Sequence, residues 1–180
     1  MAIQSFCMQQ ATNYASAHIT SIAEGCKVLK EKSRPLDVAI ENRTQFTVQR
    51  TANGEYWDSG KVFGGNFQNI PPLSRGNIAV ANSDSGFMTG VSGAVSFSLV
   101  ENETQQKVAD FVLGFSHPFS GAAKLGAGFT TNAKSGWDNI GSSASASARI
   151  FQDKYGNKTT IELHSFPGSP NASLSIVQKS

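Results

Sequence analysis

Apolar side chains in the first part of the chain recur at the spacing of a helix. From Ile3 to Leu29 they follow steps of three and four residues, while polar side chains fill the opposite face. This periodicity predicts an amphipathic helix over residues 3–32. Pro35 then ends the pattern, because proline cannot continue a helix.

After Pro35 the pattern changes to alternation of apolar and polar residues, which is typical of half-buried β-strands. Turn-forming residues such as Asn53-Gly54 and Ser59-Gly60 separate the alternating runs. Short strands at this spacing predict an antiparallel sandwich or barrel of about eight to ten strands, with residues 120–136 irregular or in a short helix. The predicted strands cover residues 37–41, 45–49, 56–57, 61–63, 77–80, 94–100, 108–113, 146–151, 159–163 and 172–177.

Together these patterns predict a mainly β protein, an antiparallel β-sandwich with an N-terminal amphipathic α-helix packed on it. The helical segment covers residues 1–34 and the sandwich covers residues 35–180. Both form one domain, because 180 residues fit the usual domain size of about 100–200. The link Ser33-Arg34-Pro35 is short, and a free apolar stripe would be an aggregation-prone surface. We therefore expect the helix to rest on the sandwich.

The composition narrows the class of protein. Only 16% of the residues are charged and the formal net charge is +2, so the chain lacks the concentrated basic face of a nucleic-acid-binding protein. With 39% hydrophobic residues it is too apolar for global disorder. No apolar run reaches the roughly 18–20 residues of a membrane-spanning helix. Residues 1–20 show no signal peptide, so we expect a cytosolic protein, one exported by another route, or one shown without its leader.

Candidate catalytic and metal-binding groups form no recognisable pattern. His117 could serve as a base for Ser116 or Ser120, but no Gly-x-Ser-x-Gly motif frames either serine. The glycine pairs do not form a phosphate-binding loop, and no Cys/His cluster has the spacing of a zinc site. We expect a protein without enzymatic activity, cofactor or bound metal.

Several short motifs follow one another in the order found in a known family. Val38-Ala39-Ile40-Glu41-Asn42 is similar to the family's Val-Gly-Ile-Asp-Asn, and Trp57-Asp58-Ser59-Gly60 is similar to its aromatic-Arg-Ser-Gly segment. Residues 89–95 are similar to its Val-Ala-Thr-Gly-Ala-Val turn and strand. The most specific match is Phe115-Ser116-His117-Pro118-Phe119, which is similar to Phe-Ser-Val-Pro-Phe. On these motifs, with an amphipathic helix ahead of them, the chain resembles the actinoporins, a family of pore-forming proteins.

The resemblance implies a sandwich that docks on membranes, often through sphingomyelin headgroups, and a helix that then detaches, inserts and oligomerises into a pore. It implies a secreted or released soluble protein that acts on target membranes. The positions that match the family's functional residues fall into three groups. The headgroup site comprises Ser59, Val91, Ser116, Pro118 and Tyr155; the membrane contact comprises Arg75, Phe119 and Trp137; the pore-lining face of the helix comprises Gln4, Gln9, Asn13, Ser16, Thr20, Glu24 and Lys27.

The chain departs from the family where the family has an aromatic-rich loop. Here Pro118-Phe119 leads into residues 120–126, which include no aromatic residue, and Asp58 stands where an arginine is expected. A changed target, either another lipid or a glycan, is one hypothesis. Two alternatives remain: a non-lytic lectin-like or headgroup-binding module on the same fold, and a partner-binding protein whose helix stays packed. Phe119 and Trp137 face either a membrane or the core.

Overall fold

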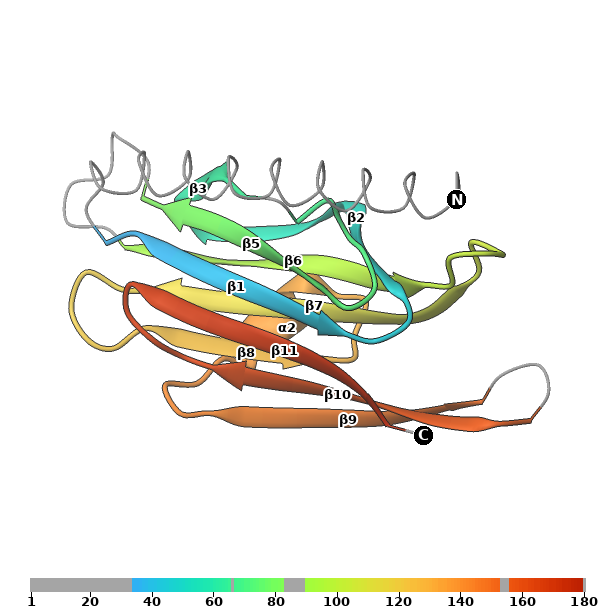
Figure 1. Cartoon of the computed structure of the whole chain (residues 1–180). Helices are drawn as coiled ribbons and strands as arrows, with labels where there is room; N and C mark the ends of the chain where they lie inside the picture. The colour runs from blue at the N-terminus through green and yellow to red at the C-terminus, as the bar shows by residue number, and fades with distance from the viewer. Residues whose placement is uncertain (1–33, 66, 83–89, 153–155, 180) are drawn as a thin grey trace, which may run out of the picture.

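The computed structural model describes residues 34–65, 67–82, 90–152 and 156–179. The predicted helix over residues 3–32, with its pore-lining positions, and Tyr155 lie outside these residues. The described chain forms two β-sheets packed face to face, with a short helix against one of them (Figure 1). The sandwich in the predicted fold is therefore confirmed.

The first sheet has six strands in the order β3-β5-β1-β11-β10-β9. Its central strands β1 and β11 are parallel, whereas the other neighbours are antiparallel. The expectation of a purely antiparallel sheet is wrong for this pair, because alternation shows which side chains face inward but not the direction of a neighbouring strand. The strands are β1 (Leu36–Arg43), β3 (Lys61–Gly64), β5 (Ser74–Ala81), β9 (Ser145–Gln152), β10 (Lys158–Phe166) and β11 (Asn171–Lys179).

The second sheet has five strands in the order β4-β2-β6-β7-β8, all antiparallel. The short helix α2 (Ala133–Asp138) packs on this sheet, chiefly on β7 and β6. In the described part of the chain no helix is long and apolar enough to cross a membrane. The strands are β2 (Thr47–Ser59), β4 (Asn69–Ile70), β6 (Val91–Val100), β7 (Lys107–His117) and β8 (Lys124–Gly128).

The core lies between the two sheets and takes its side chains from alternate positions. In β1, Leu36, Val38 and Ile40 are fully buried, while the residues between them face outward. The facing sheet contributes Phe97 and Phe111, whose rings stack with their centroids 5.3 Å apart. Burial of each such side chain contributes about 1.5–3 kcal/mol. These apolar contacts hold the strand ends, and therefore any site built on them, in fixed positions.

Strands β1 and β2 follow each other in the sequence but belong to different sheets. The chain passes from one sheet to the other at Asn42, which is 1% exposed. The Asn42 side-chain amide donates to the carbonyl oxygens of Phe46 and Pro71, at 2.8 Å each, and its oxygen accepts from Thr44 Oγ1 at 2.7 Å. The asparagine of the Val38–Asn42 motif therefore has a structural role at this corner.

Candidate functional site

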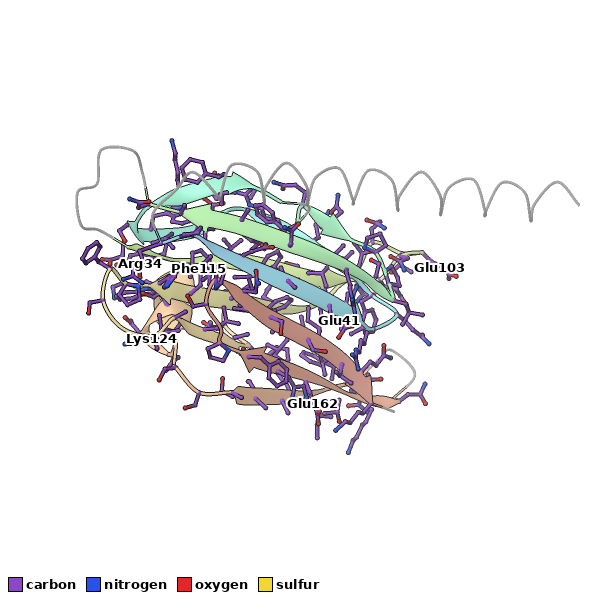
Figure 2. All side chains as sticks on the ribbon, turned by 60° about the vertical axis from the view of Figure 1, so that its left-hand side comes forward. Arg34, Glu41, Glu103, Phe115, Lys124 and Glu162 are labelled. Carbon is purple, nitrogen blue, oxygen red and sulfur yellow. The ribbon has the colours of Figure 1, made fainter. Side chains whose placement is uncertain are left out.

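Three serines on neighbouring strands form a row across one end of the five-stranded sheet. Ser59 of β2 pairs with Ser92 of β6, and Ser92 pairs with Ser116 of β7. Lys124, the first residue of β8, continues the row beside Ser116. Adjacent strands lie about 4.8 Å apart, so the row spans about 14 Å. Figure 2 shows Lys124 and Arg34 near this end of the molecule and Glu103 at the opposite end. We call Ser59, Ser92, Ser116 and Lys124 the serine row.

Pro118 and Phe119 follow Ser116 and His117 in the chain and lie beside the serine row. Gly90 permits the close approach of two segments here, because a Cβ at this position would lie 2.1 Å from the carbonyl oxygen of His117 and 2.6 Å from Pro118 Cα. The Ser59 hydroxyl donates to the Gly90 carbonyl at 3.0 Å. Phe119 is 41% exposed and lies under the guanidinium of Arg34, 5.5 Å from the ring centroid. Phe119 is therefore a surface residue of this end.

His117 ties this end of the five-stranded sheet to the other sheet. Its ring is almost fully buried, and Nδ1 lies 2.8 Å from the carbonyl oxygen of Pro35, directly before β1. Because a carbonyl oxygen only accepts, Nδ1 is the donor. Nε2 lies 2.9 Å from the hydroxyl of Ser169, which precedes β11. The ring therefore bonds to Pro35 and Ser169, and not to Ser116 or Ser120.

Trp137 of α2 borders the serine row from the outer side of the sheet. Its indole Nε1 donates to Ser92 Oγ at 2.7 Å, and its ring centroid lies 5.3 Å from that of Tyr56. The Lys134 ammonium lies over both rings, 5.3 Å from Trp137 and 5.5 Å from Tyr56. Hydrogen bonding to Asp138 raises the pKa of Lys134. The rings of Tyr56 and Trp137 therefore form a cation-binding surface that the Lys134 ammonium occupies.

Small residues on the outer face of the five-stranded sheet make room for α2. Ala94, Gly114 and Gly126 are direct neighbours on three adjacent strands. A Cβ on Gly114 would lie 2.7 Å from Ile140 Cγ2 and 2.9 Å from the Gly136 carbonyl oxygen. Asn132 begins the helix by accepting a hydrogen bond from the Ser135 amide at 3.0 Å, a typical N-cap. The sheet and the cap together fix the position of Trp137.

The predicted site residues are partly brought together. Ser59, Ser116, Pro118 and Phe119 share one end of the sandwich, and Trp137 lies next to them. Val91 is at the same end, but its side chain is fully buried in the core, so this position offers only backbone to a ligand.

Arg75 does not join these residues. It lies near the start of β5, six residues before Ala81, which is about 20 Å along a strand. Its guanidinium donates to Glu41 Oε1 at 2.7 Å and is 72% exposed. The structure thus places Arg75 near the other end of the sandwich.

Sequence reasoning missed four residues around the site: Ser92, Lys124, Tyr56 and Lys134. Strand register brings the first two into the row, and register is not visible in a single sequence. Tyr56 has a weak signal, because it alternates with the core residue Trp57 and must face outward. In the described ranges, no group of three or more His, Cys, Asp or Glu residues is placed to hold a metal ion.

The fold places the chain among β-sandwich proteins. No protein-family model matches the chain, and no curated protein sequence matches it. Among solved structures it is similar to the crystal structure of the lipid binding protein Nakanori, with a TM-score of 0.59 and 15% sequence identity. The similarity covers 98% of this chain and 85% of that chain. At this identity the likeness shows that the fold is shared.

Proposed function

We propose that the protein binds membrane lipids through their headgroups at the serine row. The observation that carries this proposal is the alignment of Ser59, Ser116 and Lys124 beside the exposed ring of Phe119 and the half-buried Tyr56–Trp137 pair. Hydroxyl and ammonium donors bind phosphate oxygens, and aromatic faces bind quaternary ammonium groups. The likeness in fold to a protein described as lipid-binding supports the same interpretation.

The headgroup chemistry that suits this end is a phosphate followed by a cation, as in phosphocholine. The hydroxyl of Ser116 and the ammonium of Lys124 supply donors for the phosphate. The Trp137 and Tyr56 rings offer a cation surface next to Ser92, but Lys134 covers it. A choline group therefore has to displace Lys134 or use the exposed ring of Phe119. Sphingomyelin carries this headgroup and is the lipid we propose first.

The test is sedimentation of the full chain with vesicles of sphingomyelin and cholesterol, with free phosphocholine as competitor. Lys124→Ala removes one charged hydrogen bond, and Ser116→Ala removes one hydroxyl. We expect Lys124→Ala to weaken binding about tenfold, since such a bond contributes about 1.5 kcal/mol or more. Lys158→Ala is the matched control, because this exposed lysine begins β10 near the other end of the sandwich. Equal losses in both lysine variants would contradict the site.

The further step that we propose is pore formation by the segment over residues 3–32, followed by self-association on the membrane. Its support is the amphipathic pattern of that segment and its junction at Pro35, which His117 holds. Release of an encapsulated dye from the same vesicles tests this step. Binding without dye release would reject the pore and leave a non-lytic headgroup-binding protein.

A further inference from the structure

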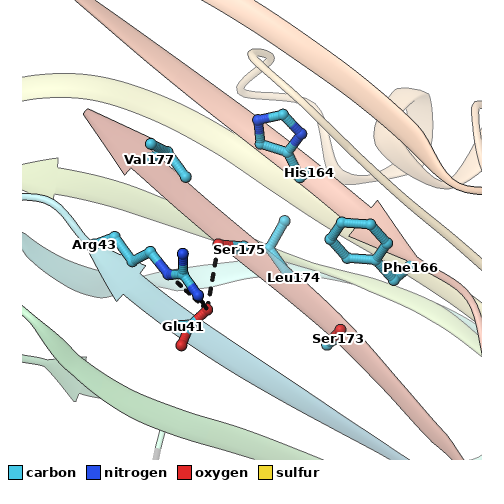
Figure 3. A pocket seen from close by; sticks show the side chains of 8 residues that line it. All are labelled: Glu41, Arg43, His164, Phe166, Ser173, Leu174, Ser175 and Val177. Atoms are coloured by element: carbon cyan, nitrogen blue, oxygen red, sulfur yellow. Dashed lines mark hydrogen bonds and ion pairs between the residues drawn. The ribbon is translucent and has the colours of Figure 1, made fainter. Parts of the chain in front are cut away.

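A second surface lies on the outer face of the six-stranded sheet, remote from the serine row. A depression of about 280 Å³ opens there over β1, β11 and β10 (Figure 3). We call it the β11 pocket. Its lining includes Glu41, Arg43, His164, Phe166, Ser173 and Ser175.

The pocket exists because short side chains lie between long ones in register. On β11 the outward positions Ser173 and Ser175 form the floor. Ser173 pairs with Phe166 of β10, whereas Ser175 pairs with His164 on one side and Glu41 on the other. Side chains of paired residues stand on the same face of a sheet. The aromatic rings and the Glu41–Arg43 pair therefore form opposite walls (Figure 3).

Each carboxylate at the β11 pocket has cationic or imidazole partners. Glu41 binds Arg43 at 2.6 Å and Arg75 at 2.7 Å, and hydrogen bonding to Arg75 holds the pKa of Glu41 below its ordinary value. Next to the pocket, Glu162 binds Lys179 at 2.7 Å and His164 at 2.8 Å. A free anion entering the pocket meets the Glu41 carboxylate, and a free cation meets the Arg43 guanidinium. The pocket therefore favours a neutral ligand.

We infer that the β11 pocket binds a saccharide. A sugar ring is neutral and carries hydroxyls that both donate and accept, which suits the Glu41 carboxylate, the Arg43 guanidinium and the serine hydroxyls of the floor. Its apolar C–H face can pack on Phe166, an aromatic side chain left 47% exposed. Small-molecule pockets start at about 300 Å³, so the space suits one or two rings rather than a long oligosaccharide.

The first test exposes the labelled full chain to an array of immobilised glycans, and the sugar that binds is then titrated calorimetrically in free form. We expect Glu41→Gln and Phe166→Ala each to weaken binding at least fivefold. Glu103→Gln and Ile150→Ala are the matched controls, because Glu103 is exposed and Ile150 is 65% exposed outside the pocket. We expect both controls to bind as the parent does. Phe166 is on the surface, so Phe166→Ala keeps the fold, which a thermal melt checks.

Two outcomes would overturn the inference. One is an array on which no glycan binds. The other is a sugar whose binding survives Glu41→Gln and Phe166→Ala but is lost in Lys124→Ala, since that sugar would occupy the serine row. Vesicles that carry the same sugar on a glycolipid, without phosphocholine lipids, separate a glycolipid ligand from a soluble glycan. Binding to the glycolipid vesicles or to the free glycan supports the pocket if Glu41→Gln and Phe166→Ala abolish that binding. The headgroup proposal is tested separately by the phosphocholine vesicles.

Discussion

The outer face of the five-stranded sheet carries small residues and is covered by α2, whereas on the outer face of the six-stranded sheet charged side chains surround the β11 pocket, which no described helix covers. On the first face Ala94, Gly114 and Gly126 leave room for a helix. On the second face Glu41 and Glu162 are each held by two cationic or imidazole partners. Small residues thus leave room for α2 on the first face, while ion-paired side chains stand beside the β11 pocket on the second.

Disrupting the packing of α2 on the five-stranded sheet should cause the largest loss of stability. Gly114→Val places methyl groups where the backbone of α2 lies, since even a Cβ approaches Gly136 and Trp137 to about 3 Å. We expect a loss of about 3 kcal/mol in the free energy of unfolding, measured by urea denaturation. Gly128→Val is the matched control, because nothing lies within 4 Å of a Cβ there. A similar loss of stability in both variants would show that the packing of α2 does not depend on the space left by Gly114.

A smaller effect is expected where the two sheets are joined. His117→Ala removes the hydrogen bonds to Pro35 and Ser169 and leaves a cavity where the buried imidazole ring stood. We expect a loss of about 2 kcal/mol in the free energy of unfolding, because each lost hydrogen bond contributes about 0.5–1.5 kcal/mol and the cavity adds a further loss. His164→Ala on the outer face of the six-stranded sheet should change the free energy of unfolding by less than about 1 kcal/mol, as its main partner is a partly exposed carboxylate. If both histidine variants unfold alike, His117 does not join the sheets.

The contact between α2 and the serine row allows a finer test. Trp137→Phe keeps an aromatic ring but removes the indole donor to Ser92, whose side chain is buried. We expect a loss of about 1 kcal/mol in denaturant unfolding. Tyr56→Phe retains the ring that faces Trp137 and should change stability by about a few tenths of a kcal/mol. A Trp137→Phe variant as stable as the Tyr56→Phe variant would indicate that this hydrogen bond is energetically neutral.

The ion pairs of Glu41 and Glu162 should contribute the smallest effect on stability, and their contribution should depend on pH. Hydrogen bonding to Arg75 lowers the pKa of Glu41 in the folded protein, and hydrogen bonding to Lys179 lowers the pKa of Glu162. A carboxyl whose pKa is lower when folded stabilises the fold above its unfolded pKa of about 4.3, and this contribution is lost as the pH falls through the folded pKa. We therefore expect Tm to decrease below about pH 4. The double variant Glu41→Gln/Glu162→Gln should have a weaker dependence, and an identical Tm profile would argue against these pairs.

The sandwich could be predicted because alternation is a local property. Leu36, Val38 and Ile40 show period two in the sequence and are all buried in β1. Ser59, Ser116 and Pro118, which match the family motifs, lie at one end of the sandwich in the structure. Arg75 could not be placed in this way, since its distance from that end depends on how β5 pairs with β1.

By itself, the sequence determined which side chains enter the core, because period-two burial follows from the geometry of a single strand. It also determined that Ser59, Ser116 and Pro118 are candidates for one site. Only the tertiary structure decided that Ser92 and Lys124 complete the serine row, and that Ser173 and Ser175 form the floor of a pocket. The reason is that register and strand order are set by pairing between distant segments, which no local pattern records.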